Sequence, residues 1–106
     1  MPPQSEAQHA EISSAATNAT IVAAVAGKRI RVLSFFLVAV TAVTVRFEST
    51  SGGAALTGLM SVGATDVLAP GYNPLGHFQT VAGQLLNLEL GGTVQVSGAL
   101  TYVLVD

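Results

Sequence analysis

The chain has 106 residues, of which 50% are hydrophobic and only 9% are charged, with a formal net charge of −2. This length fits one domain, and so small a net charge does not indicate nucleic acid or an anionic membrane as a partner. The chain has no cysteine, which excludes disulfides and thiolate metal sites. Charged residues make up about 25% of typical soluble proteins. We therefore expect another chain to cover part of the surface, because a lone domain with so few charges would expose broad apolar patches.

The first 17 residues are rich in Pro, Ser, Ala and Gln and show little periodicity. This composition predicts an extended or disordered arm over residues 1–17, with a short helix around residues 5–14 as the alternative. The start "MPPQSEAQHAEISS" has neither the basic beginning nor the apolar core of a signal peptide. The folded domain is expected over residues 18–106.

Between Arg31 and Arg46 lie fourteen residues without a charge. As a helix they would reach about 21 Å, short of the roughly 30 Å core of a bilayer. Many of them are β-branched, which suits strands, but one strand of this length would extend about 46 Å. The segment is therefore expected to form two strands with a turn near residues 40–42. In the second strand Val45 and Phe47 face one way and Arg46 the other.

Further strands are predicted wherever apolar residues alternate between Gly, Pro and Asn turns. The "GG" at 91–92 indicates a hairpin between two strands, and Gly98 indicates a bulge in the last strand. About eight strands follow one another with no convincing helix, which predicts an antiparallel β-sandwich. The expected ranges are 18–25, 29–39, 43–49, 55–62, 65–70, 77–81, 84–90 and 93–105.

Several apolar side chains fall on faces that the alternation predicts to point outward. In the strand 29–39, Arg29 and Arg31 share one face, and the residues at 33, 35 and 37 are expected to continue it. We interpret these apolar positions as a subunit interface. The alternative is that the faces are assigned the wrong way round, because a one-residue slip exchanges every face of a strand. The predicted interface residues are Leu33, Phe35, Leu37, Leu85 and Val103.

Candidates for catalysis are few. His9 and His77 lie far apart in sequence, and no carboxylate stands at metal-ligand spacing from either. Ser34 and Ser61 lack the G-x-S-x-G context of an activated serine. His77 is interpreted as the first residue of a strand, making a local hydrogen bond. No enzyme activity, metal or cofactor is therefore expected.

Two surface groups remain as candidates for binding. Lys28, Arg29 and Arg31 form the one basic cluster, which either contacts an acidic partner surface or is a solvated corner that blunts edge pairing. Tyr72 and Asn73 lie in the loop "GYNPLG" and form a possible ligand loop.

Three stretches, "GKRIRV", "AGQLLNL" and "VSGALTY", give the chain a family resemblance over residues 18–105. In these stretches it resembles small jelly-roll proteins encoded by tailed bacteriophages. The resemblance implies a structural virion protein, made in the host cytoplasm and placed on the capsid surface, where homotrimers decorate or cement the head and contact the major capsid protein. The alternative is a receptor- or glycan-binding tip module of a head fibre or tail. The expected capsid contacts are Pro2, Pro3, Gln4, Lys28, Arg29 and Arg31.

Overall fold

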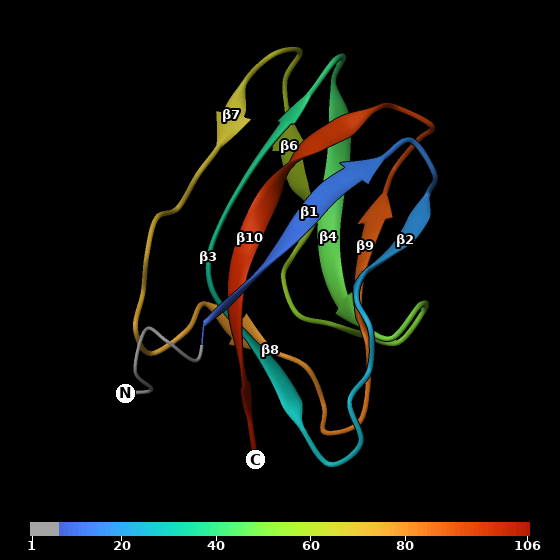
Figure 1. Ribbon diagram of the computed structural model, residues 1–106. Coiled ribbons are helices and arrows are strands. Elements are labelled where there is room, and N and C mark those ends of the chain that lie inside the picture. Colours follow the sequence, from blue (N-terminus) through green and yellow to red (C-terminus); the bar gives the residue numbers. More distant parts are fainter. Residues whose placement is uncertain (1–6) are drawn as a thin grey trace.

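The computed structural model describes residues 7–106, which form two antiparallel β-sheets packed face to face (Figure 1). This part of the chain contains no helix, and so none that is long and apolar enough to cross a membrane. The predicted all-β sandwich is confirmed. The strands are β1 (Gln8–Ser14), β2 (Asn18–Val22), β3 (Arg29–Ala39), β4 (Val43–Ser49), β5 (Ala54–Ala55), β6 (Met60–Val62), β7 (Val67–Leu68), β8 (Phe78–Gln79), β9 (Leu86–Leu90) and β10 (Val96–Val105).

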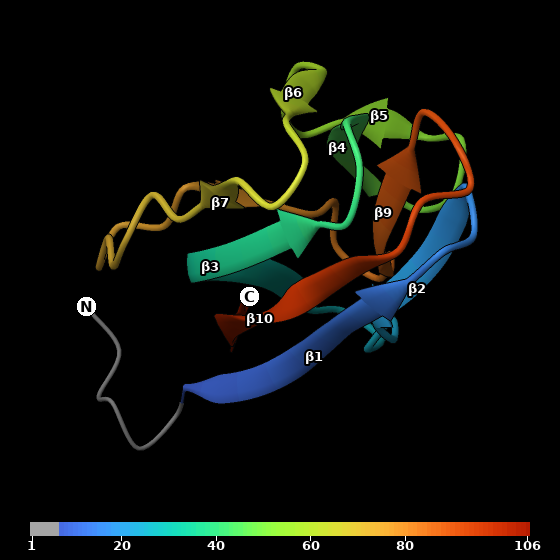
Figure 2. The ribbon, with the colours of Figure 1, turned by 90° about the horizontal axis from the view of Figure 1, so that it is seen from above.

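The first sheet, sheet A, has the order β1-β10-β3-β7, with β8 also paired to β3. The second, sheet B, has the order β2-β9-β4-β5, with β6 also paired to β4. Seen from above, the two sheets form separate layers with the core between them (Figure 2). Strands that follow each other in sequence are mostly in different sheets, so most connections cross from one layer to the other.

Aromatic rings join the two layers at the centre of the core. Phe35 of β3 meets Phe47 of β4 edge to face, with ring centroids 5.2 Å apart, and Phe78 of β8 lies 5.1 Å from Phe47. Phe47 and Val45 are fully buried, which confirms the faces predicted for β4. The buried core cluster comprises Ile12, Val22, Ile30, Val32, Phe35, Leu37, Ala39, Val45, Phe47, Val62, Leu86, Leu88, Leu90, Val96 and Leu100.

The faces predicted for β3 are wrong beyond Val32, because a β-bulge interrupts the alternation. Tyr102 of β10 pairs with Val32, but the preceding Thr101 pairs with Ser34, so Leu33 is an extra residue in the ladder. An extra residue shifts all later side chains to the opposite face. Phe35 and Leu37 therefore join Val32 in the core instead of continuing the face of the arginines.

The predicted arm at residues 1–17 is wrong for residues 8–14, which form an edge strand of sheet A. β1 pairs with β10 without interruption from Gln8↔Tyr102 to Ser14↔Val96. Ile12 is only 1% exposed and belongs to the core cluster. The alternative of a short helix fails over the same residues. The alternation of Ala10 and Ile12 with polar residues is the pattern of a half-buried strand, but it covers too few apolar residues to stand out.

The two glycine predictions near the last strand are also wrong. Gly91 and Gly92 do not form a hairpin, because β9 lies in sheet B and β10 in sheet A. Gly98 pairs in register with Leu37 and Ile12, so it is not the bulged residue. At this position a Cβ would collide with the backbone carbonyl of Phe36, so the close approach of two strands requires glycine.

The remaining strands are shorter than predicted. The expected strand 55–62 is divided into β5 and β6, and the expected strands 65–70 and 77–81 are reduced to the two-residue pairings β7 and β8. Between β7 and β8 the chain contains Pro70 and Pro74, which lack the N–H that a sheet ladder needs. Sheet A thus has one long edge, β1, and one short, interrupted edge.

Candidate functional site

The outer surface of sheet A carries an apolar patch that the sequence did not reveal. After the bulge at Leu33, the side chain of Phe36 points away from the core and is 52% exposed. Val38 pairs with Val67 of β7, which is 67% exposed, and Phe36 pairs with Ala99 of β10. We call Phe36, Val38 and Val67 the outer apolar face. A bulge has no reliable sequence pattern, so alternation alone does not place Phe36 on the outer surface.

The residues predicted for a subunit interface are not brought together on a surface. Phe35 and Leu37 are core residues, 6% and 0% exposed, and are therefore unable to contact a second subunit in this fold. Leu33 and Val103 are buried, at 2% and 1%, and stand outside the core cluster described above. Leu85 is half-buried. The outer apolar face lies on the side of β3 where we expected Phe35 and Leu37.

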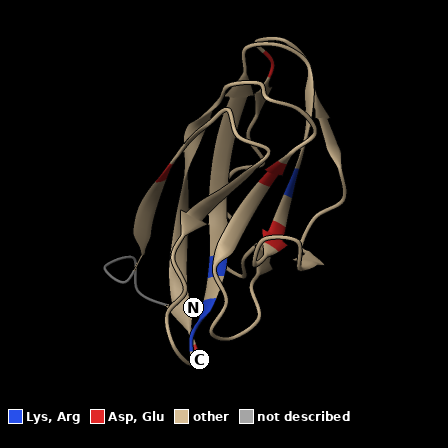
Figure 3. Cartoon of the chain, turned by 90° about the vertical axis from the view of Figure 1, so that its right-hand side faces the viewer, with Lys and Arg blue, Asp and Glu red and all other residues tan. Residues whose placement is uncertain are grey.

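The predicted basic cluster lies at the end of the sandwich where the C-terminus lies, and Figure 3 shows Lys and Arg gathered there. Lys28 forms an ion pair with Asp106, and Arg31 donates from Nε to Oε1 of Gln79 at 3.0 Å. The stem of Arg31 packs where Gly76 leaves room for it. Arg29 lies beside them in β3, half-buried. Pro2, Pro3 and Gln4 lie outside the described residues.

The predicted ligand loop is held in place by its own hydrogen bonds. The backbone N–H of Asn73 donates to the carbonyl of Leu33 at 2.7 Å, and its side chain accepts from the N–H of Leu75 and donates to the carbonyl of Gly76. His77 makes the local contact predicted for it, with Nε2 2.7 Å from the carbonyl oxygen of Gly71. Tyr72 is 51% exposed on this fixed loop, so its ring is presented to solvent.

A buried polar network lies on sheet B, across β4 and β9. Nη2 of Arg46 donates to Glu48 at 2.9 Å and to Glu89 at 2.6 Å. Oε1 of Glu48, a residue only 1% exposed, accepts from the backbone of Gly52 and from Nδ2 of Asn87. These bonds satisfy the buried carboxylate from within the chain, which makes the network a structural connection rather than a binding site. Alternation along one strand does not reveal this network, because the network depends on which residues of β4 and β9 lie opposite each other.

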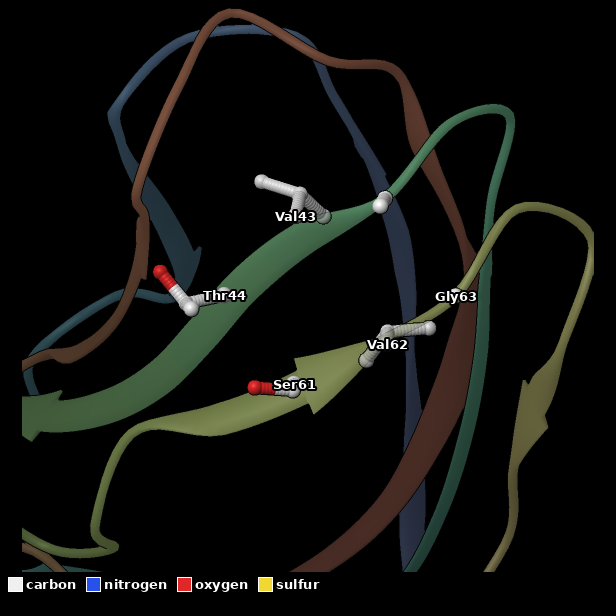
Figure 4. A pocket seen from close by; sticks show the side chains of 6 residues that line it. Val43, Thr44, Ser61, Val62 and Gly63 are labelled. Carbon is white, nitrogen blue, oxygen red and sulfur yellow. The ribbon is translucent and has the colours of Figure 1, made fainter.

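Two adjoining pockets lie beside β6, one of which is drawn in Figure 4. The first has a volume of about 320 Å³ and lies between β4 and β6, where Figure 4 shows the hydroxyl-bearing side chains of Thr44 and Ser61 next to Val43 and Val62. The second, of about 310 Å³, contains one carboxylate, Asp66. Two hydroxyls and one carboxylate are too few converging groups to define a chemistry.

Among the residues described, no group of three or more His, Cys, Asp or Glu could hold a metal ion. No protein-family model, curated protein or solved structure matches the chain. The fold and its surfaces define the protein as an all-β sandwich with an apolar outer face on one sheet, a basic end and a rigid loop that carries an exposed tyrosine.

Proposed function

We propose that the protein is a structural virion protein of a tailed bacteriophage, a homotrimeric decoration or cement protein on the capsid. The observation that carries the proposal is the outer apolar face, on which Phe36 and Val67 are each more than half exposed. Apolar side chains that gather on one exposed sheet face are a candidate surface for contact with another protein. The charge-poor composition and the family resemblance of residues 18–105 support the same role.

We also propose that the sandwich is a jelly roll. With β5 and β6 taken as one interrupted strand, and β7 and β8 as another, residues 7–106 form eight strands. Four of them form each sheet, and the first and last strands are neighbours in sheet A. All connections between these eight strands then cross between the sheets except the one that leaves β4, as two interlocked Greek keys require.

In this role three chains pack their outer apolar faces around an axis, and the basic end with Lys28, Arg29 and Arg31 contacts the major capsid protein. Three weak contacts in one body bind far more tightly than one, because the second and third become intramolecular. Substitution of Arg29 tests this capsid contact most directly, because the side chains of Lys28 and Arg31 already bind Asp106 and Gln79 within the chain.

The experiment is to measure the mass of the purified protein by light scattering and to look for the protein in purified phage particles by mass spectrometry and reconstruction. We expect a trimer that the Phe36→Ser substitution converts to smaller species. The matched control is Leu59→Ser, since Leu59 is also highly exposed, at 62%, but lies between β5 and β6 of the other sheet. A monomer at every concentration, or a trimer unaffected by Phe36→Ser, contradicts the proposal.

A receptor- or glycan-binding module is the second candidate, and Tyr72 favours it. An exposed aromatic ring on a loop fixed by hydrogen bonds is typical of a binding surface. Binding on a glycan array that is lost in Tyr72→Ala but kept in Leu75→Ala would support this function over decoration. Leu75 is the matched control because it lies in the same loop and is 81% exposed.

A further inference from the structure

The edges of the two sheets differ in how well they are protected against pairing with another chain. Unpaired edge strands recruit further strands unless they are short, bulged, covered, or contain lysine, proline or an inward-pointing charge. Three of the four edges described are protected in this way. β5 and β6 have two and three residues, β7 and β8 have two each, and the pairing of β2 is shifted between Thr20 and Val22.

β1 is the exception. It has seven residues, contains no Lys, Pro or Gly, and pairs with β10 on one side without a register shift. It ends the strand order of sheet A, so its other side has no strand beside it among the residues described. Figures 1 and 2 show β2 near the C-terminal end of β1, whereas the rest of β1 lies away from it. The open side is therefore widest over residues 8–12.

We propose that this edge binds the same edge of a second copy, with the two β1 strands antiparallel about Ala10. The pattern of side chains selects this partner and this register. His9 and Glu11 are both exposed on the outer face of sheet A, two residues apart. A two-fold axis at Ala10 places His9 of each chain opposite Glu11 of the other, so that one interface contains two such pairs.

Neighbouring registers that keep both cores on the same side of the joined sheet lack this complementarity. An axis at Glu11 places two carboxylates opposite each other, and an axis at His9 places two imidazoles opposite each other. Two directly opposed carboxylates repel each other, whereas an imidazole N–H can donate a hydrogen bond to an opposed carboxylate. Nδ1 of His9 already contacts Oγ1 of Thr101 at 3.3 Å, which leaves Nε2 as the nitrogen that faces the partner's carboxylate.

The inference goes beyond the proposed virion role. The outer apolar face is centred on β3 and the open edge is β1, two strands away in sheet A, so one chain can use both. Trimers form around a three-fold axis, and at higher protein concentration the β1 edges join trimers to one another about two-fold axes. A symmetric edge contact uses the same residues on both chains and closes on itself as a dimer.

The test is sedimentation velocity over a range of protein concentrations, carried out with Phe36→Ser so that contacts through the outer apolar face do not contribute. We expect a dimer. His9→Glu replaces both attractive pairs by carboxylate pairs and should weaken this dimer about tenfold or more. His9→Glu combined with Glu11→Lys places opposite charges at these two positions in the same register and should recover the dimer.

The matched control is Thr41→Glu, which adds the same charge at an exposed position in the turn between β3 and β4. It should leave the dimer unchanged. Hydrogen exchange gives a second readout, because backbone amides of residues 8–12 that face the open side should exchange more slowly as the dimer forms. The inference is overturned if the protein stays monomeric at the highest attainable concentration, or if His9→Glu leaves the dimerisation constant unchanged. Absence of the protein from phage particles would contradict the virion role alone.

Discussion

Gly98 of β10 lies so close to the backbone carbonyl of Phe36 in β3 that no side chain fits between them. Two neighbouring strands approach each other here at the middle of sheet A, where β10 is flanked by β1 and β3. Glycine is therefore required at this position for steric reasons, and its φ is not in the left-handed region.

Gly98→Ala should destabilise the fold by about 1–3 kcal/mol, because the added methyl group forces the two backbones apart. The free energy of unfolding from a urea titration measures this effect. Gly92→Ala is the matched control, since a Cβ at Gly92 meets nothing within 4 Å. If the two substitutions cost the same, the close approach of β3 and β10 is wrong.

The bulge at Leu33 makes opposite predictions for two adjacent phenylalanines. Phe35→Ala removes a ring from the aromatic centre of the core and should cost about 3–5 kcal/mol. Phe36→Ala, one residue later, should cost less than about 1 kcal/mol because its ring is half exposed. Denaturant titrations of both variants measure the difference. The reverse order would mean that β3 continues its alternation without a bulge.

Ile12→Ala tests whether residues 8–14 belong to the folded domain. Ile12 is buried between the sheets, so the truncation should cost about 2–5 kcal/mol. Ser13→Ala, at an exposed position of the same strand, is the control and should have little effect. Thermal unfolding of both proteins compares them. Equal melting temperatures would indicate a detached arm.

The Arg46–Glu48 ion pair should stabilise the protein because Arg46 neutralises the charge of the buried Glu48 carboxylate. Arg46→Met leaves Glu48 without its cation and should cost about 3 kcal/mol. Glu89→Gln removes the more exposed partner of the same arginine and should cost less than about 1 kcal/mol. Urea titrations at neutral pH measure both. Equal costs would mean that burial of Glu48 does not matter to the pair.

Features of the fold that depend on neighbouring residues were predicted from the sequence, whereas features that depend on residues far apart in the chain were not. The bounds of β3 and β4 are correct because glycine, basic residues and a short turn bracket two long apolar runs. The two glycines at 91–92 indicated a hairpin, yet which sheet a strand joins depends on partners far away in sequence. β10, for instance, pairs with β1 and β3 and not with β9.

The candidate surfaces were predictable only in part. The basic cluster and the Tyr72 loop were recognisable because their residues are adjacent in sequence; the three basic residues are half-buried and Tyr72 is exposed. The outer apolar face depends on the single extra residue at Leu33, which alternation cannot detect. The network of Arg46, Glu48 and Asn87 requires the register of β4 against β9, which local patterns do not specify.

The place of β10 between β1 and β3 has a consequence for synthesis of the protein. β1 and β3 cannot be joined into sheet A until β10, the last strand described, has left the ribosome, because β10 is the strand that pairs with both. Pairings between segments this far apart in sequence form slowly. Nascent chains should therefore depend on chaperones until β10 has emerged, and deletion of a few residues of β10 should be more damaging than deletion of the same number from any loop.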